Sequence, residues 1–299
     1  MVNKICNKCG GSHIKKDWKM RWKQRYKCCN CWYVFQNNSR NYKSWKLWND
    51  YTNHKQTYNE LWEKYKKDVT TISRQLDKYE VKKEKIKPQP TVLIIDTTYF
   101  WRSFGIMVFR SYELKKNLLW KEVKWETLEA YKSWIQQLEN EWWEIKAIVC
   151  DGKKWLLNMK RPVQMCIFHQ KAILRRYLTK SPLLEPNKEL KEIWSLIWNI
   201  RKTTLKAMLD DRYNRNKVFF NEKNNKWKYV HERTRKAYKS LIHNLNNLYI
   251  FKEYEGKIEI PRTSNSLESL FSGLKQRIRI HRWLKKERKL KLIDSFLSK

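Results

Sequence analysis

Three acidic residues are candidates for a role in chemistry rather than in packing. Asp96 follows the apolar, β-branched run 91–95, Asp151 follows the apolar run 145–150, and Glu268 lies in the segment 261–284. A carboxylate at the end of a buried strand destabilises the fold unless it holds a cation or a strong donor. Carboxylate oxygens bind Mg²⁺, and two such ions about 4 Å apart can activate an oxygen nucleophile and stabilise a leaving oxygen at a phosphodiester. We therefore consider these residues first as ligands of a metal-dependent site.

The amino-terminal cysteines form a second candidate metal site. Two C-x2-C pairs, Cys6 with Cys9 and Cys28 with Cys31, are separated by eighteen residues. This spacing predicts that four thiolates bind one structural Zn²⁺ in a zinc ribbon over residues 1–36. In so short a segment the metal replaces a hydrophobic core and contributes on the order of 10 kcal/mol. The alternative is a set of unrelated thiols, and Cys29 has no assigned role.

The composition predicts an anionic partner. The chain of 299 residues has 66 Lys and Arg against 30 Asp and Glu, a formal charge of +36, and it is rich in Trp, Tyr and Phe. Nucleic acid is the commonest partner of so basic a protein, although a codon bias toward Lys would raise the charge without a function. No apolar run approaches the ~18–20 residues of a membrane span, and the first residues do not resemble a secretory signal. We expect a protein of the cytoplasm, with no membrane partner.

Residues 55–80 have the pattern of a helix-turn-helix. Apolar residues recur at helical spacing, with a break near Lys67 that Asp68 or Thr70 would cap as the start of a second helix. The apolar positions are Leu61, Tyr65, Val69, Ile72 and Leu76. The second helix would then carry Thr71, Ser73, Arg74 and Gln75 outward, and Arg74 and Gln75 are the predicted DNA contacts. The alternative is an ordinary helical hairpin. Residues 37–54 are predicted to be a polar connector, and the Pro-containing segment 81–90 a linker.

The middle of the chain predicts an α/β fold with an RNase H-like core. Apolar runs at 91–95, 104–109, 117–123, 145–150 and 163–168 are typical of strands. Between the third and fourth runs, a helix has Leu128, Tyr131, Ile135, Leu138 and Trp142 on one face. Three strands, a helix and two more strands, with acids after the first and fourth strands, predict the first part of the core over residues 91–181.

The rest of the chain is predicted to be helical. Residues 182–255 are highly charged, contain two apolar stripes and are expected to form an α-helical insertion, in which Trp194 and Trp198 serve packing. Residues 256–299 are expected to complete the core with a helix whose packed side contains Leu267, Leu270, Phe271, Leu274 and Ile278. Glu268 lies beside that side. The predicted DNA contacts of this segment are Lys275, Arg277, Arg279 and Arg282.

Four motifs carry a family resemblance. The order IIDTTYF, IVCDGKK, MCIFHQ and TSNSLESLFSGLKQRIR resembles the DDE transposases of the Mutator-like group and their bacterial insertion-sequence relatives. The resemblance implies that Asp96, Asp151 and Glu268 are the catalytic triad and hold two Mg²⁺ or Mn²⁺ ions. It also implies a structural role near the active site for Cys166 and His169. The amino-terminal zinc ribbon and helix-turn-helix are similar to modules that bind terminal repeats.

The resemblance implies a function and its partners. The chain would bind terminal inverted repeats of a mobile element and catalyse metal-dependent DNA cleavage and strand transfer. Its partners would be double-stranded DNA, as transposon ends and as target, and a second copy in a homodimer or higher synaptic assembly in the bacterial cytoplasm or nucleoid. The main alternative is a DNA-binding transcriptional regulator with an inactive transposase-derived core. An RNase H-like nuclease or resolvase is a weaker one.

Overall fold

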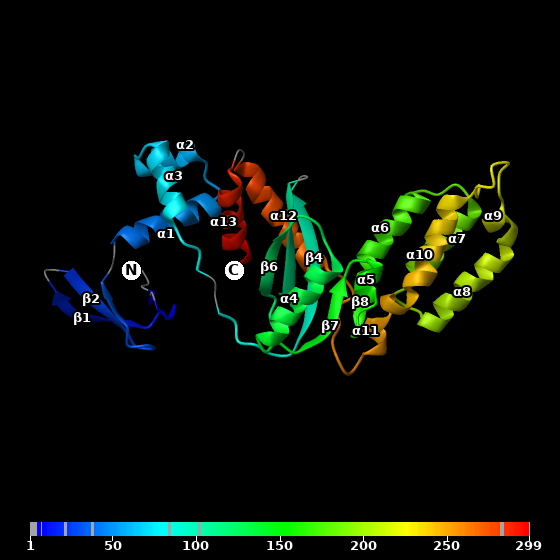
Figure 1. Cartoon of the computed structure of the whole chain (residues 1–299), viewed down its shortest axis with the longest axis horizontal. Helices are drawn as coiled ribbons and strands as arrows, with labels where there is room; N and C mark the ends of the chain where they lie inside the picture. Colours follow the sequence, from blue (N-terminus) through cyan, green and yellow to red (C-terminus); the bar gives the residue numbers. More distant parts are fainter. Residues whose placement is uncertain are drawn as a thin grey trace. The chain divides into compact units, whose positions relative to one another are not determined.

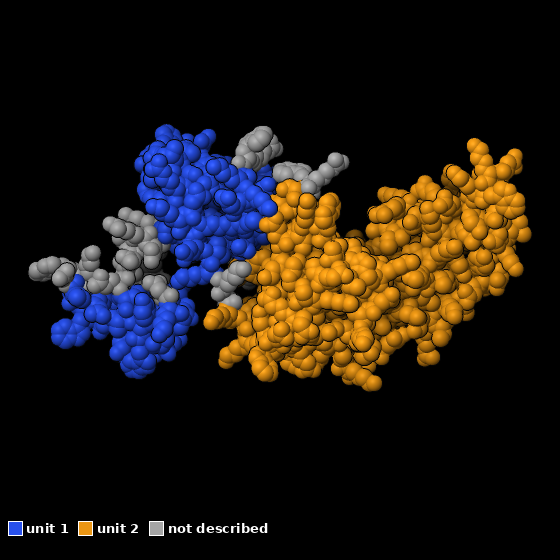
Figure 2. All heavy atoms as spheres, in the orientation of Figure 1, with its two compact units in different colours: residues 1–82, 277–296 blue, residues 83–276, 297–299 orange. Residues whose placement is uncertain are grey.

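The chain folds into two compact units. A computed structural model describes residues 5–6, 8–20, 23–36, 39–82, 85–100, 103–281 and 284–298. Unit 1 contains residues 1–82 and 277–296, and unit 2 contains residues 83–276 and 297–299 (Figure 2). No helix of the described residues is long and apolar enough to cross a membrane.

Unit 1 begins with a small antiparallel sheet. Its strands are β1 (Ile14–Met20), β2 (Lys23–Cys28) and β3 (Val34–Gln36), in the order β1-β2-β3. Cys6, Cys28 and Phe35 are its buried residues, with Ile14 and Tyr26 packed against them. So few apolar side chains cannot stabilise a sheet of this size, which is the usual reason for a structural metal in such a module.

Three helices follow the sheet, and one of them was not predicted. They are α1 (Ser39–Thr52), α2 (Tyr58–Tyr65) and α3 (Val69–Lys78). The prediction of a connector at 37–54 was wrong because Leu47, Trp48 and Tyr51 form a buried stripe between polar residues.

The turn between α2 and α3 has the predicted position. The left-handed residue Lys66 ends α2, and the Asp68 side chain caps α3 by accepting from the Thr71 N–H. The Leu61, Ile72 and Leu76 side chains are buried, whereas Val69, which was expected on the packed face, is 42 % exposed.

The carboxyl-terminal helix α13 (Lys286–Leu297) packs on these three helices. Trp48 Nε1 donates to Ser295 Oγ at 2.8 Å, and Arg288 donates to Asp77 and to Ser73 Oγ. Residues 256–299 were expected to belong to the core, but residues 277–296 lie in unit 1. The apolar residues of α13, among them Leu292 and Ile293, are buried there.

Unit 2 is built on a mixed sheet of five strands. They are β4 (Thr91–Phe100), β5 (Phe104–Ser111), β6 (Asn117–Val123), β7 (Ile145–Cys150) and β8 (Val163–Met165), in the order β6-β5-β4-β7-β8. β4, β5 and β6 pair antiparallel, while β4, β7 and β8 pair parallel. This order and these orientations are consistent with the predicted RNase H-like core. β8 is shorter than predicted, since Ile167 and Phe168 already belong to a helix.

Helices cover this sheet and extend from its β8 edge (Figure 1). They are α4 (Leu128–Asn140), α5 (Lys154–Leu157), α6 (Ile167–Leu178), α7 (Glu185–Ser195), α8 (Lys202–Arg215), α9 (Lys217–Asn221), α10 (Glu232–Leu248), α11 (Ile250–Glu253) and α12 (Asn265–Ile280). The segment 182–255 is helical as predicted, and α10 packs against α6 and α8. Trp142, which was expected on the packed face of α4, is 87 % exposed, and Trp143 is buried instead.

We expect the packing of α13 to stabilise the helices of unit 1. Leu292 is 1 % exposed, so Leu292→Ala should lower the free energy of unfolding of unit 1 by about 2–5 kcal/mol. The loss should appear as faster amide hydrogen exchange in α1, α2 and α3. The control, Val218→Ala, changes a side chain that is 87 % exposed and should leave these rates unchanged. Equal exchange in the two variants would show that the helices do not depend on α13.

Candidate active site

Asp96 lies where β4 loses one of its two partners. β4 pairs with β7 only as far as Ile94, whereas its pairing with β5 continues to Phe100. The strand was predicted to end at Asp96, but the hairpin with β5 prolongs it. The aspartate therefore occupies the edge of the parallel half of the sheet. One of its oxygens, Oδ1, accepts from the Thr97 N–H at 2.8 Å.

Asp151 follows the neighbouring strand β7 at the same edge. Its Oδ1 accepts a long hydrogen bond, 3.4 Å, from the Lys153 backbone N–H, and its Oδ2 lies 3.6 Å from Lys153 Nζ. The next residue is Gly152, and a Cβ there would lie 2.3 Å from Met165 Cε, so a larger residue would require the Met165 side chain to move. Close packing of this loop on β8 thus fixes where the aspartate stands.

Glu268 is presented by the first turn of α12, and the chain before this helix is tied to α6. The Ile167 N–H donates to the Arg262 carbonyl at 3.1 Å, and the Ser264 N–H donates to Cys166 Sγ at 3.3 Å. His169, one turn into α6, has its Nε2 3.9 Å from Glu268 Oε1. Cys166 therefore connects the chain before the glutamate helix to the start of α6, while the structural role of Cys166 and His169 near an active site stays a prediction.

The two aspartates lie in an environment that disfavours their charge. Burial raises the pKa of the Asp96 carboxyl above its ordinary value, against the opposing effect of the His169 charge, and the Glu268 charge raises it further. Burial also raises the pKa of Asp151, and the charge of Asp96 adds to that rise. Each aspartate thus responds to the charge of another predicted site acid. Such an environment is the one that a bound cation would relieve.

The charge of His169 acts on both aspartates and lowers their pKa values. Interaction with the Cys166 sulfur raises the pKa of His169 to about 9, and the charges of Asp96 and Glu268 act in the same direction. Burial raises the pKa of Cys166, but interactions with His169 and Ser264 outweigh it, so that the pKa of this thiol is lowered. His169 is therefore an imidazolium at neutral pH, and it compensates part of the acidic charge.

A second set of polar residues borders the aspartates and was not singled out from the sequence. Glu126, which lies before α4, accepts hydrogen bonds from Lys153 Nζ and from the Tyr131 hydroxyl. The Tyr131 hydroxyl in turn lies 3.1 Å from Thr97 Oγ1. Burial lowers the pKa of Lys153, while the charge of Asp96 raises it. The only sequence signal for this group was the lysine pair directly after Asp151–Gly152.

The structure brings the predicted ligands together in part. Among the described residues, the sets of three or more metal-binding side chains whose ligand atoms lie within 4.8 Å of one another are the four cysteines and the set Cys166, His169, Glu268. The three carboxylates of Asp96, Asp151 and Glu268 influence one another electrostatically but form no such tight set. Like charges repel, and His169 lies beside the glutamate. Their oxygen donors fit a hard cation such as Mg²⁺, which would draw them together.

The four amino-terminal cysteines form the second set. Cys6 Sγ lies 3.5 Å from Cys31 Sγ, and Cys9 Sγ lies 3.5 Å from Cys28 Sγ. The two close pairs interleave, so each contact joins one C-x2-C motif to the other. Four thiols at these distances fit a tetrahedral Zn²⁺. Cys29 lies outside the set, and its backbone N–H donates to the His13 carbonyl.

The residues predicted to contact DNA differ in how exposed their side chains are. Arg74, Lys275 and Arg279 are exposed. Gln75 is half-buried and accepts from Lys67 Nζ at 3.0 Å. Arg277 is half-buried over the Phe296 ring at 4.4 Å, and burial lowers its pKa. Arg282 lies outside the described residues. Ser73, which was expected to face outward, is covered by Arg288 of α13.

Comparisons with known proteins add little to this description. No family model matches the sequence, and no curated protein is significantly similar to it. Forty-five chains of solved structures match. One is the "Drosophila P element transposase strand transfer complex", with 11 % identity and a TM-score of 0.42 over 86 % of this chain and 92 % of that chain. So low a TM-score carries no argument about function, and the match gives no support to the Mutator-like group.

We expect one zinc ion per chain at the four cysteines. Cys9→Ser should abolish it and increase amide hydrogen exchange throughout β1, β2 and β3, because the metal substitutes for a core. The matched control is Cys29→Ser, which removes the neighbouring thiol outside the set. Elemental analysis gives the metal content. Zinc retained in full by Cys9→Ser, or lost equally in both variants, would exclude this ligand set.

The raised pKa of Asp96 predicts a pH-dependent stability. The folded state binds the proton more tightly than the unfolded state, so the carboxylate destabilises the metal-free protein once the pH exceeds its folded pKa. In EDTA, Asp96→Asn should therefore melt at a higher temperature than the wild type at neutral pH. The difference should vanish as the pH falls below the ordinary pKa of aspartate. Mg²⁺ should raise the melting temperature of the wild type only. A lower melting temperature of Asp96→Asn at neutral pH would show that Asp96 is stabilised as an anion.

Proposed function

We propose that this protein is a DDE transposase that cleaves DNA at the ends of a mobile element and joins the freed 3′ ends to target DNA. One observation carries the proposal. Two half-buried aspartates lie where the pairing of the parallel strands β4 and β7 ends, their pKa values are raised, and the charge of Glu268 on α12 contributes to that shift for Asp96. Acids in this arrangement reduce the stability of a fold, so their presence supports a catalytic use.

In this proposal Asp96, Asp151 and Glu268 hold two divalent cations, Mg²⁺ or Mn²⁺. The ions would supply Lewis acidity toward the phosphodiester and compensate the charge that develops on its oxygens. The residues of the chain hold these cations and set the local charge. The His169 imidazolium and the Lys153 ammonium offset the acids in the absence of metal, and both could contact a phosphate.

Recognition of the element is assigned to unit 1. The exposed Arg74 on α3 and the cationic β1–β2 hairpin are suited to phosphates and base edges. Cations alternate with aromatic residues in the sequence of that hairpin, and Lys27 Nζ of β2 lies 4.5 Å from the centre of the Trp32 ring in the turn before β3. The formal charge of +36 supports binding to double-stranded DNA at both transposon ends and target. Assembly as a homodimer or larger synaptic complex, in the bacterial cytoplasm, completes the proposal.

The alternative of a transcriptional regulator with an inactive core has less support. A core without catalysis would be more stable with neutral residues at positions 96 and 151, because burial disfavours the charge of both aspartates. The two functions differ in one observable property, metal-dependent cleavage. A simple nuclease or resolvase would cut without transferring the 3′ ends.

We expect the three acids to be required for cleavage but not for DNA binding. With Mg²⁺ and a duplex taken from the inverted repeats that flank the gene, the wild type should nick one strand. Asp96→Ala, Asp151→Ala and Glu268→Ala should each reduce the rate at least about 100-fold, because each removes a metal ligand. Gel-shift affinity for the same duplex should change little.

The control for this experiment is Glu129→Gln, which changes an exposed acid of α4 and should cleave like the wild type. Cleavage by all three alanine variants at the wild-type rate would refute the assignment of the site. Sequence-specific binding without metal-dependent cleavage by the wild type would favour the regulator.

A further inference from the structure

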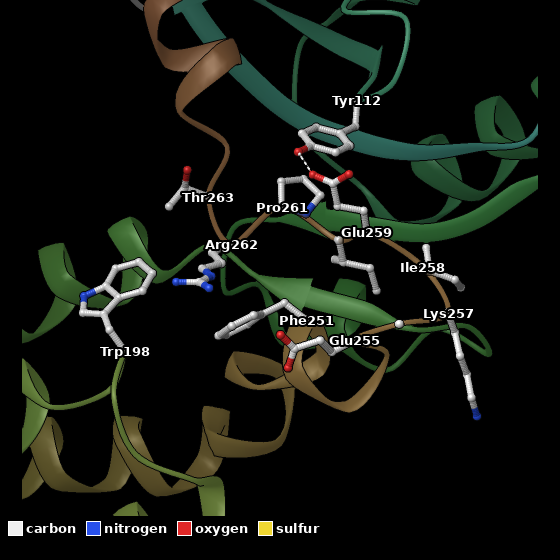
Figure 3. Close-up of a pocket in the computed structure, with 12 residues that line it drawn as sticks. Tyr112, Trp198, Phe251, Glu255, Lys257, Ile258, Glu259, Pro261, Arg262 and Thr263 are labelled. Carbon is white, nitrogen blue, oxygen red and sulfur yellow. Dashed lines mark hydrogen bonds between the residues drawn. The ribbon is translucent and has the colours of Figure 1, made fainter.

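A pocket of about 690 Å³ lies directly before α12 in unit 2 (Figure 3). Its wall is formed mainly by residues 255–263, with Phe251 of α11, Trp198 after α7 and Tyr112 after β5. The volume falls in the range of ordinary ligand sites. The proposed function makes no use of this pocket.

One side of the pocket is a stack of flat groups. The guanidinium carbon of Arg262 lies 5.4 Å from the centre of the Trp198 ring and 4.6 Å from that of Phe251. Arg262 points between the two rings (Figure 3), and its side chain has no hydrogen-bond partner among the described residues. Trp198 is 41 % exposed, whereas Trp194 is buried. We expected both tryptophans to serve packing. Trp194 does so, whereas the exposed part of the Trp198 ring is available for stacking.

The other side of the pocket is acidic. The Glu259 carboxylate accepts from the Tyr112 hydroxyl at 2.6 Å through Oε1, which leaves Oε2 for another donor. Glu255 is exposed and also lines the pocket. Arg262 and Lys257 also line the pocket, so its charge is mixed, and the two carboxylates can accept hydrogen bonds from N–H groups. A suitable ligand is therefore flat and carries an amino group.

The pocket is connected to the acidic site. Thr263 lines the pocket and precedes Glu268 by only five residues, so the two Cα atoms are separated by at most about 12 Å. The Arg262 carbonyl accepts a hydrogen bond from the Ile167 N–H, and the Ser264 N–H donates to Cys166 Sγ. Both contacts lie at the start of α6, the helix that carries His169. A few nucleotides of a DNA strand, at about 3.4 Å of helix rise each, span this distance.

We propose that this pocket receives one unpaired nucleobase of the DNA strand whose phosphate lies at the acids. The base would stack on Trp198 and on the guanidinium of Arg262, and its exocyclic amino group would donate to Glu259 or Glu255. Adenine, cytosine and guanine carry such a group, and thymine does not. The inference rests on the proposed function, since it requires DNA at the neighbouring acids.

The test uses the full chain without added Mg²⁺ or Mn²⁺, so that binding is measured without cleavage and the expected Zn²⁺ stays bound. The ligands are deoxycytidine, deoxyadenosine and thymidine oligomers of about six nucleotides, a length that a single-strand groove can hold. The salt concentration is set high enough to suppress non-specific phosphate binding. Affinity comes from fluorescence anisotropy, and one 2-aminopurine in the adenine oligomer reports stacking through its emission.

The variants distinguish the loss of stacking in the pocket from the loss of an exposed aromatic side chain elsewhere. Trp198→Ala removes the open ring, Trp198→Phe keeps an aromatic face, and the double variant Glu255→Gln, Glu259→Gln removes the two charges. Trp227→Ala is the matched control, because this tryptophan of the same insertion is 80 % exposed and does not line the pocket.

We expect the cytosine and adenine oligomers to bind more tightly than the thymine oligomer. Trp198→Ala should weaken their binding about 5- to 100-fold and should abolish the change in 2-aminopurine emission. Trp198→Phe and Trp227→Ala should stay near the wild type, and the double glutamine variant should lose the preference over thymine. Unchanged binding by Trp198→Ala, or equal binding of the thymine oligomer by the wild type, would overturn the inference. If the wild type cleaves its duplex while Trp198→Ala binds normally, the pocket assignment fails and the transposase proposal does not.

Discussion

The organisation of unit 2 depends on the cost of keeping two carboxylates at one edge of a sheet. Burial disfavours the charge of Asp96 and of Asp151, and within the described part of the chain each aspartate accepts one backbone hydrogen bond that favours its anion. The surrounding chain reduces this cost with the imidazolium of His169 and the ammonium of Lys153. The C-x2-H turn at the start of α6 serves this balance through His169, and its buried Cys166 also accepts from the Ser264 N–H.

The same balance is visible at Glu268, whose Oε1 lies 3.9 Å from His169 Nε2. The elements that carry these acids are nevertheless fixed. Gly152 allows the loop after β7 to pack on Met165, and two hydrogen bonds tie the chain before α12 to α6. The backbone is thus organised in advance, while small movements of side chains remain available for a cation to select.

The strands could be predicted from the sequence because they depend on local signals. Apolar runs predicted β4, β5 and β7 within a few residues, the segment 117–123 predicted β6, and the cysteine spacing predicted the four-thiol set. Features that depend on distant contacts were not readable. The stripe on α1 is broken by polar residues, and the docking of α13 joins positions such as Trp48 and Ser295, which are far apart in the chain. Glu126 and Tyr131 had no motif at all, because a hydrogen-bond network leaves no periodicity in a sequence.

The packing of α13 on the amino-terminal helices has a consequence for how the protein is made. A ribosome releases α1, α2 and α3 before most of unit 2, but their partner α13 only after it. Until then Leu61, Ile72 and Leu76 can pack among themselves, whereas the surface around Trp48 lacks its cover. A prematurely terminated nascent chain would therefore not complete unit 1. Only chains that already contain Asp96, Asp151 and Glu268 would therefore acquire a complete unit 1.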